Sequence, residues 1–139
     1  MNMNRREQYQ TKLNFITDKM HNLPENPNET ESSIENFFQT IQTSIEASIE
    51  VIAMLCKDFD FEEGDMYANL DQLRAINVFS PEFVKEMRQL NAMRYLIRQK
   101  FTSTDENLLA EQKIVTIKIL DEFVGRIDET ISERLSHIK

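Results

Sequence analysis

The sequence predicts an all-α protein, an antiparallel bundle of four to five helices of which two are long. The 139 residues include only 2 glycines and 3 prolines, whereas sheets need many tight turns and the residues that make them. Apolar residues make up 40% of the chain and recur at helical spacing over long stretches. This length fits one domain, which we expect to span residues 1–139 with a helical core at about 5–136.

The first two helices are expected at 5–21 and at about 30–57. Two of the three prolines lie in the connector 22–29, which ends the first helix. The second helix is about 40 Å long at 1.5 Å per residue, and an acidic connector at 58–65 follows it. Its apolar face is wide enough to need more than one partner helix. The members of its stripe, close to a heptad seam, are Ile34, Phe37, Phe38, Ile41, Ile45, Ile49, Ile52, Leu55 and Cys56.

A short third helix is expected after Asp65, which would cap it, while Gly64 is a plausible break before it. Tyr67, Leu70 and Leu73 are predicted to lie on one side of it. The chain then turns at residues 77–79. Ser80, Pro81 and Glu82 are a strong helix start, with a capping hydroxyl, a proline at the first helical position and an acid in the first turn.

The fourth helix is expected at about 81–100 and the last at about 105–136. Gly125 inside the last helix suggests a close helix crossing. The apolar stripe of the fourth helix is interrupted at Arg94, and a guanidinium there is costly unless it faces a cleft, an acid or an anion. The other members of that stripe are Phe83, Met87, Leu90, Ile97 and Phe101.

Charge and cysteine content exclude several classes of function. With 24 acidic and 16 basic residues the net charge is −8, so any site for a polyanion must be a local basic patch. One cysteine, Cys56, allows no internal disulfide and favours a cytoplasmic location. His21 and His137 lie too far apart to build a structural zinc site with it. We expect no signal peptide, no membrane-spanning segment, no metal and no cofactor.

The fourth helix carries a basic block, five cations against the single acid Glu86. Such a block can hold phosphate, or it can neutralise an acidic surface such as 58–65, because charge runs are usually solvated faces. The five cations are Lys85, Arg88, Arg94, Arg98 and Lys100.

The run YANLDQLRAINVFSPEFVKEMRQLNAMRYLIRQKFTSTDENLL resembles the HepT-like family of the HEPN superfamily. Members show a tyrosine opening a short helix, an acid-rich helix start, and then a helix ending in the pattern R-N-x-x-x-H-x-Y. Upstream, QTIQTSIEASIEVIAMLCKDF resembles the long second helix of the family. The resemblance covers about residues 5–130.

This resemblance implies an RNA-cleaving toxin that forms a homodimer and is paired with a nucleotidyltransferase antitoxin. In the family, an arginine and a histidine line a cleft at the dimer interface. The histidine acts as general acid and base, the arginine stabilises the phosphate, and no metal is required. The antitoxin silences some members by adding nucleotide to the tyrosine of the motif.

Matched position by position, only part of the motif is present. Arg94 falls on the family arginine, and Tyr95 stands where asparagine is usual. Gln99 stands at the histidine position; an amide does not titrate near neutral pH and cannot shuttle the proton. Phe101 stands at the tyrosine position and has no hydroxyl to modify. The anion-binding half of the site remains, with a predicted patch that consists of Arg88, Arg94, Arg98 and Lys100.

Three hypotheses follow. The chain is a HepT-like homodimer with a degenerate motif, inactive or with residual activity, that binds RNA, a nucleotide or a nucleotidyltransferase. Alternatively it is an active, metal-independent ribonuclease that uses another base, or a purely structural helical dimer. Arg94 would bind phosphate under the first two and pair with an acid across the dimer under the third. The wide apolar stripes of the second and last helices favour a dimer.

Overall fold

The computed structural model describes residues 3–23, 31–99 and 106–138. Within these ranges the chain forms five helices and no strand, which confirms the predicted all-α class. The helices are α1 (Arg5–His21), α2 (Glu31–Asp58), α3 (Met66–Ala75), α4 (Pro81–Gln99) and α5 (Glu106–Arg134).

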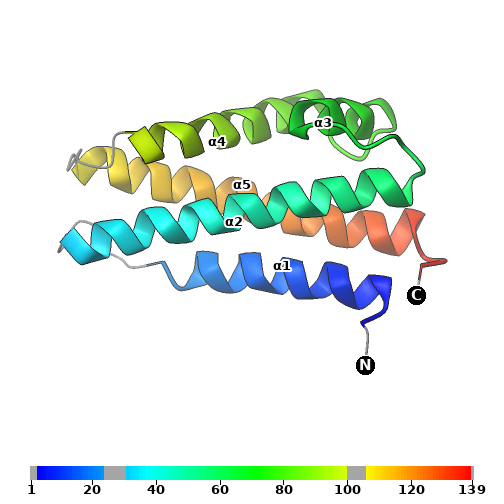
Figure 1. The fold of residues 1–139 in the computed structure, drawn as a ribbon, viewed down its shortest axis with the longest axis horizontal. Helices are drawn as coiled ribbons and strands as arrows, with labels where there is room; N and C mark the ends of the chain where they lie inside the picture. Colours follow the sequence, from blue (N-terminus) through cyan, green and yellow to red (C-terminus); the bar gives the residue numbers. More distant parts are fainter. Residues whose placement is uncertain (1–2, 24–30, 100–105, 139) are drawn as a thin grey trace.

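The four longer helices run alternately up and down, and the short α3 lies between α2 and α4 in the chain (Figure 1). Because of this alternation the start of α1 and the end of α5 lie at the same end of the bundle. The long α2 contacts all four other helices. The prediction that its wide apolar face needs several partners is therefore confirmed, and those partners come from within one chain.

The buried face of α1 follows the predicted spacing. Asn4 caps the helix by accepting a hydrogen bond from the Glu7 amide at 2.9 Å. The residues on the inner face are all at most 2% exposed, namely Tyr9, Leu13, Ile16 and Met20. Of the stripe predicted for α2, all members are buried except Ile49, which is partly buried.

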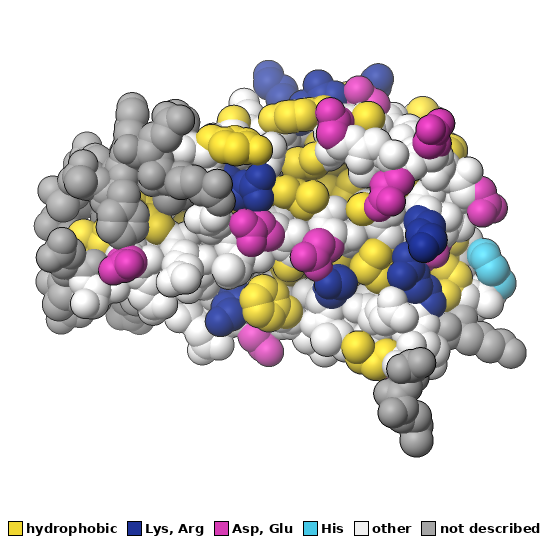
Figure 2. Space-filling view, viewed as in Figure 1, with side chains coloured by type: hydrophobic (Ala, Val, Ile, Leu, Met, Phe, Trp, Pro, Cys, Tyr) yellow, Lys and Arg dark blue, Asp and Glu magenta, His cyan; other side chains and the backbone are white. Residues whose placement is uncertain are grey.

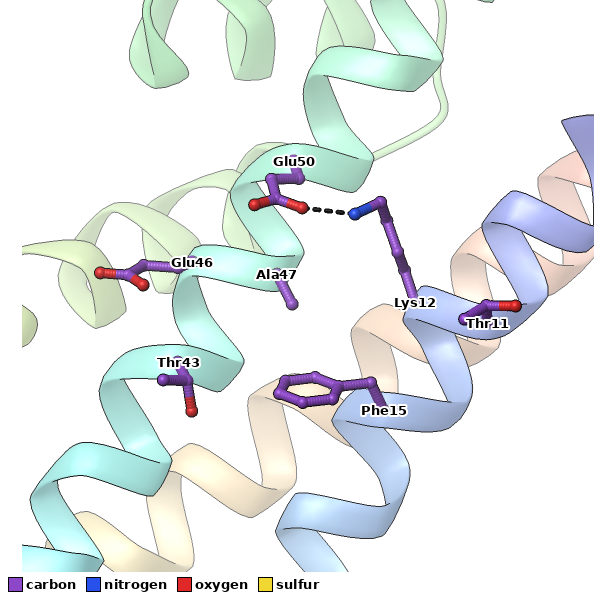
Figure 3. Close-up of a pocket in the computed structure, with 7 residues that line it drawn as sticks. All are labelled: Thr11, Lys12, Phe15, Thr43, Glu46, Ala47 and Glu50. Carbon is purple, nitrogen blue, oxygen red and sulfur yellow. Dashed lines mark hydrogen bonds and ion pairs between the residues drawn. The ribbon is translucent and has the colours of Figure 1, made fainter. Parts of the chain in front are cut away.

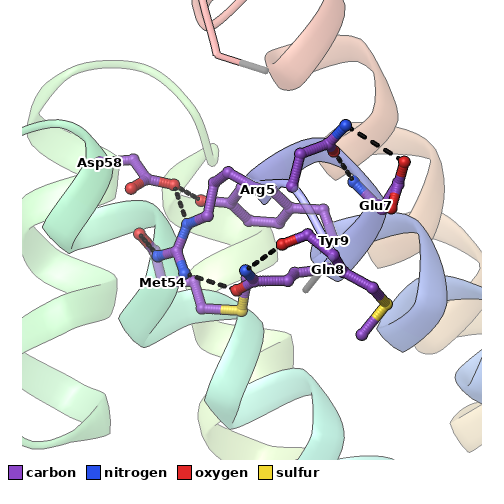
Figure 4. A network of polar contacts seen from close by, with 8 residues as sticks. Arg5, Glu7, Gln8, Tyr9, Met54 and Asp58 are labelled. Atoms are coloured by element: carbon purple, nitrogen blue, oxygen red, sulfur yellow. Dashed lines mark hydrogen bonds and ion pairs between the residues drawn. The ribbon is translucent and has the colours of Figure 1, made fainter. Parts of the chain in front are cut away.

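A polar network fixes the start of α1 to the end of α2 (Figure 4). The Arg5 side chain donates to Asp58 Oδ2 at 2.8 Å and to the Met54 carbonyl at 3.3 Å. The fully buried Tyr9 donates its hydroxyl to the same Asp58 carboxylate. Burial, reinforced by this bond, raises the pKa of Tyr9 far above its usual value. Asp58, the first acid of the 58–65 connector, is therefore already bound by Arg5 and Tyr9 of α1.

Helices α3 and α4 begin as the sequence predicts, but two details differ. Asp65 caps α3 by accepting from the Ala68 amide at 2.8 Å, and Ser80 caps α4 by accepting from the Phe83 amide at 3.1 Å. The left-handed backbone in the 58–65 connector is at Asp60, with φ 62°, and not at Gly64. Tyr67, predicted on the same side as Leu70 and Leu73, is 40% exposed, whereas both leucines are fully buried. The buried face is instead formed by Met66, Asn69, Leu70 and Leu73.

One hydrophobic core runs through all five helices. Phe79, Phe83 and Phe123 meet in it, with ring centroids 5.0 Å and 6.1 Å from Phe79. Gly125 marks no close helix crossing, which corrects that prediction, because a Cβ there would meet nothing within 4 Å. None of the described helices is long and apolar enough to cross a membrane. On the face shown in Figure 2, acidic and basic side chains are interspersed and apolar side chains are exposed between them.

Candidate functional site

The candidate site is built around Arg94, in the second half of α4. Phe83, Met87 and Leu90 precede it at helical spacing and are at most 2% exposed. Arg94 continues this buried stripe, and only 16% of its side chain is exposed. Arg94 therefore follows a buried apolar stripe, as the spacing predicts, whereas the side chain of Ile97, the next predicted member, lies outside the described part of the structure.

The contacts of Arg94 are loose for a side chain so well covered. Its Nη1 lies 3.6 Å from Oε1 of Glu46 on α2, a distance too long for a hydrogen bond. Its Nη2 donates to the Tyr95 hydroxyl at 3.4 Å, and its guanidinium carbon lies 5.1 Å from the centre of the same ring. Tyr95 is itself 52% exposed. Arg94 therefore has an ion-pair partner in the same chain but no well-formed charge-assisted bond.

Two buried polar atoms near this point have no hydrogen-bond partner among the described residues. They are Nε of Arg94 and Oδ1 of Asn91, which lies one helical turn earlier. Asn91 is 4% exposed, and its amide nitrogen donates to the Tyr67 hydroxyl of α3 at 3.4 Å. Buried polar atoms normally find partners, so unpaired ones indicate strain or a bound group that completes them. Of the two unpaired atoms, Nε of Arg94 is a donor and Oδ1 of Asn91 is an acceptor.

Glu46 also lines a cavity of about 300 Å³ between α1 and α2. Figure 3 shows Lys12 of α1 paired with Glu50, while the Glu46 carboxylate points away from the α1 side chains. The Oε1 atom of Glu46 instead accepts a long hydrogen bond from Gln42 at 3.4 Å and lies near Arg94 of α4. The other residues around the cavity are Thr11, Phe15, Thr43 and Ala47.

The predicted anion-binding patch is only partly described. Arg88 lies on a different side of α4 from Arg94, donating to Asp71 of α3 at 2.6 Å with its guanidinium carbon 5.3 Å from the Tyr67 ring centre. Gln99 is the last residue of α4, but its side chain and that of Arg98 lie outside the described part of the structure. Lys100 and Phe101 lie outside it entirely. The described arginines of the patch pair with Asp71 and Glu46, not with the acids of 58–65.

The other candidate residues behave as the sequence predicts. His21 ends α1, His137 follows the end of α5, and both are exposed. Cys56 is fully buried, and burial raises the pKa of its thiol to about 11. Within the described ranges no group of three or more histidine, cysteine, aspartate or glutamate side chains could hold a metal ion.

Sequence reasoning missed two residues of this site, Glu46 and Asn91. Asn91 could have been found, because it lies four residues after buried Met87 and three before Arg94, on the same broad face. Glu46 gives no such signal. It lies on the partly exposed edge of α2, and only the packing of α2 against α4 brings it to Arg94.

In this all-α bundle the largely covered Arg94 lies beside the carboxylate of Glu46, and one buried donor and one buried acceptor nearby have no partner among the described residues. The family described as Ribonuclease HepT-like matches residues 24–127, three quarters of the chain. The chain belongs to this family, which is part of the HEPN superfamily. The resemblance seen in the motifs is thereby confirmed.

Two curated proteins of Archaeoglobus fulgidus, both named "Putative RNase", are similar to the chain. The first is 24% identical over 129 residues, which cover 93% of this chain and 97% of that protein. The second is 25% identical over 101 residues, which cover 73% and 76%. No solved structure shows a significant match.

Proposed function

We propose that the chain is a HepT-like homodimer of the cytoplasm whose motif is degenerate and whose remaining role is to bind RNA, a nucleotide or a nucleotidyltransferase antitoxin. The observation that carries this proposal is the state of Arg94. Its side chain is well covered, its Nε has no hydrogen-bond partner among the residues that the structure describes, and its guanidinium lies 3.6 Å from Glu46, too far for a hydrogen bond. By comparison, Arg88 donates to Asp71 at 2.6 Å, a close charge-assisted bond that Arg94 lacks. Membership in a ribonuclease family supplies the class of ligand.

Loss of catalysis is proposed because Gln99 stands where the family histidine acts. An amide can hydrogen-bond a phosphate but cannot accept the proton of a ribose hydroxyl. Phe101 likewise offers no hydroxyl for nucleotide transfer. The silencing modification of the family is therefore not expected on this chain.

The dimer is proposed from exposed apolar side chains and from family membership. The argument from the wide stripe of α2 no longer supports it, because four helices of the same chain cover that stripe. What remains open to a second copy is the first half of α5 and the neighbouring part of α4. There Ile114, Val115 and Tyr95 are 68%, 47% and 52% exposed.

The experiment is cleavage and binding of a labelled single-stranded RNA in the presence of a chelator. We expect no cleavage, and we expect Arg94→Ala to weaken binding at least several-fold more than Arg88→Ala. Circular dichroism shows whether both variants remain folded. Equal effects of the two variants would indicate a diffuse basic surface and overturn the role given to Arg94. Light scattering at micromolar concentration tests the dimer.

A gain-of-function variant tests the degenerate motif directly. Gln99→His together with Phe101→Tyr restores the family pattern around Arg94. If the scaffold is intact, this double variant should cleave RNA and the cleavage should disappear when Arg94→Ala is added. Absence of cleavage in a folded double variant would contradict the alignment of these positions.

A second candidate function, an active ribonuclease, is favoured by the carboxylate of Glu46. Its Oε1 lies 3.6 Å from the Arg94 guanidinium, close enough for both to reach one phosphodiester. A carboxylate can act as general base where histidine is absent. Under this alternative the native chain cleaves RNA in chelator, and Glu46→Gln abolishes cleavage while binding persists.

A further inference from the structure

A second cavity lies on the other side of α4, against α3. Its volume is about 240 Å³. Val84 forms part of its wall and is 4% exposed, so the cavity reaches the edge of the core. The other residues that line it are Asp71, Arg74, Pro81, Lys85 and Arg88.

Three of these six side chains are cations, and Asp71 alone among them is acidic. The chain as a whole carries a net charge of −8. The cavity, by contrast, has an excess of positive charge. In Figure 2 Lys and Arg side chains gather along the upper edge, where Figure 1 places α3 and α4. Like charges gathered in this way repel each other unless an anion lies between them.

The spacing of the cations explains why they converge. Lys85 and Arg88 are three residues apart on α4, and Asp71 and Arg74 are three apart on α3, so each pair shares one face of its helix. Since α3 and α4 pack together, the two pairs meet across the cavity. Pro81 is the first residue of α4, so the N-terminus of this helix, where the helix dipole is positive, also borders the cavity.

One of the three cations is held in place and two are uncommitted. Asp71 and the ring of Tyr67 fix the Arg88 guanidinium. By contrast, neither Arg74 nor Lys85 has a side-chain ion pair or hydrogen bond with any residue in the described ranges. A fixed guanidinium beside two free cations suits a phosphate group, which accepts several charge-assisted bonds at once.

We infer that the cavity between α3 and α4, lined by Arg74, Lys85 and Arg88, binds a phosphate group, separately from Arg94. The bound group is either a phosphate of RNA, in which case the inference rests on the proposed function, or free inorganic phosphate. The exposed ring of Tyr67 beside Arg88 favours RNA, because bases stack on aromatic side chains.

Two measurements test this. Inorganic phosphate is titrated into ¹⁵N-labelled protein, and binding of a labelled 12-nucleotide RNA is followed by fluorescence anisotropy at several salt concentrations. The test variant is Arg74→Gln/Lys85→Gln. The control, Lys57→Gln/Lys118→Gln, removes the same charge at exposed positions that do not line the cavity. All four positions are exposed, so we expect both variants to fold as the native chain does.

We expect phosphate to shift the amide signals of residues 71–88, and the test variant to lose this response while the control keeps it. RNA affinity should fall about ten-fold in the test variant and less than about two-fold in the control. The slope of log affinity against log salt should decrease in magnitude by about 1.4, or about 0.7 for each lost contact to single-stranded RNA.

The outcomes separate the inference from the proposed function. Phosphate shifts without loss of RNA affinity would support the cavity as a site for free phosphate. If phosphate shifts these amide signals but the native chain binds no RNA, the phosphate site in the cavity is supported and RNA binding is refuted. If phosphate moves no signal of the cavity, and the two double variants bind RNA alike, the inference is wrong. In that case Arg94→Ala still tests the proposed function by itself.

Discussion

Replacing Glu46 by glutamine should tighten the binding of RNA, because it frees Arg94 from a competing carboxylate. Two unit charges about 4 Å apart interact by about 1 kcal/mol in water and about 4 kcal/mol at the edge of a protein. The Glu46 side chain is 43% exposed and its distance to Arg94 is long, 3.6 Å, so the value lies near the lower limit, about 1 kcal/mol. That corresponds to an affinity gain of about five-fold.

The assay is fluorescence anisotropy with the native chain, Glu46→Gln and the matched control Glu50→Gln. Glu50 lines the same cavity, lies one turn further along α2 and pairs with Lys12 instead. Both variants remove one negative charge, so a gain specific to Glu46→Gln measures release of Arg94. The melting temperature should fall by no more than about 4 °C.

Two results would refute this reasoning. An equal gain in both variants would mean that only the overall charge matters. A loss of affinity in Glu46→Gln would mean that the carboxylate itself holds the ligand and that Arg94 is a structural partner. Cleavage by the native chain that disappears in Glu46→Gln, with binding retained, would instead identify Glu46 as the base of an active enzyme.

Three further predictions concern stability and reactivity. Gly125→Ala should raise the free energy of unfolding by about 0.5–1 kcal/mol, measured by urea denaturation, because the new Cβ meets open space and alanine favours the helix; destabilisation would contradict the open surroundings. The native chain should lose about 1.4 kcal/mol of stability per pH unit above about pH 10 through Tyr9, because the unfolded state then releases a proton that the folded state keeps. Tyr9→Phe should lower this slope by about 1.4 kcal/mol per pH unit and leave only the part due to the Cys56 thiol, whose pKa is also raised, to about 11; an unchanged slope in the variant would refute the assignment. The Cys56 thiol, buried and with its pKa raised to about 11, should react with a thiol reagent at pH 8 only after unfolding; rapid labelling of the folded chain would contradict this.

The helices themselves could be predicted from the sequence because local signals determine their ends. The first helix has the predicted bounds, 5–21, and the fourth begins at the predicted Pro81. Asp65 and Ser80 cap their helices through bonds to the amide three residues on. These interactions involve neighbours in the chain, so no knowledge of the packing is needed.

Predictions that depended on contacts between helices were less successful. Tyr67 lies on the outside of α3 because Met66 takes the buried position beside Leu70 and Leu73. The pairing of Arg94 with Glu46 joins residues 48 positions apart, and no spacing within α4 indicates it. The position of Arg94 after a buried apolar stripe could be predicted, but not the acid that it meets.

The basic block of α4 shows why charge along a chain is a poor guide to a surface. Arg88 and Arg94 are six residues apart, which separates them by about 9 Å along the axis and about 120° around it. The packing then gives each its own neighbour, Asp71 on α3 and Glu46 on α2. A run of cations that looks like one patch in the sequence is therefore divided between two sides of one helix. Since Arg94 shares no hydrogen-bond or ion-pair partner with Arg74 or Lys85 among the described residues, the free energies of RNA binding lost on removing Arg94 and on removing Arg74 with Lys85 should add. A shortfall from additivity would mean that the two sides act as a single surface.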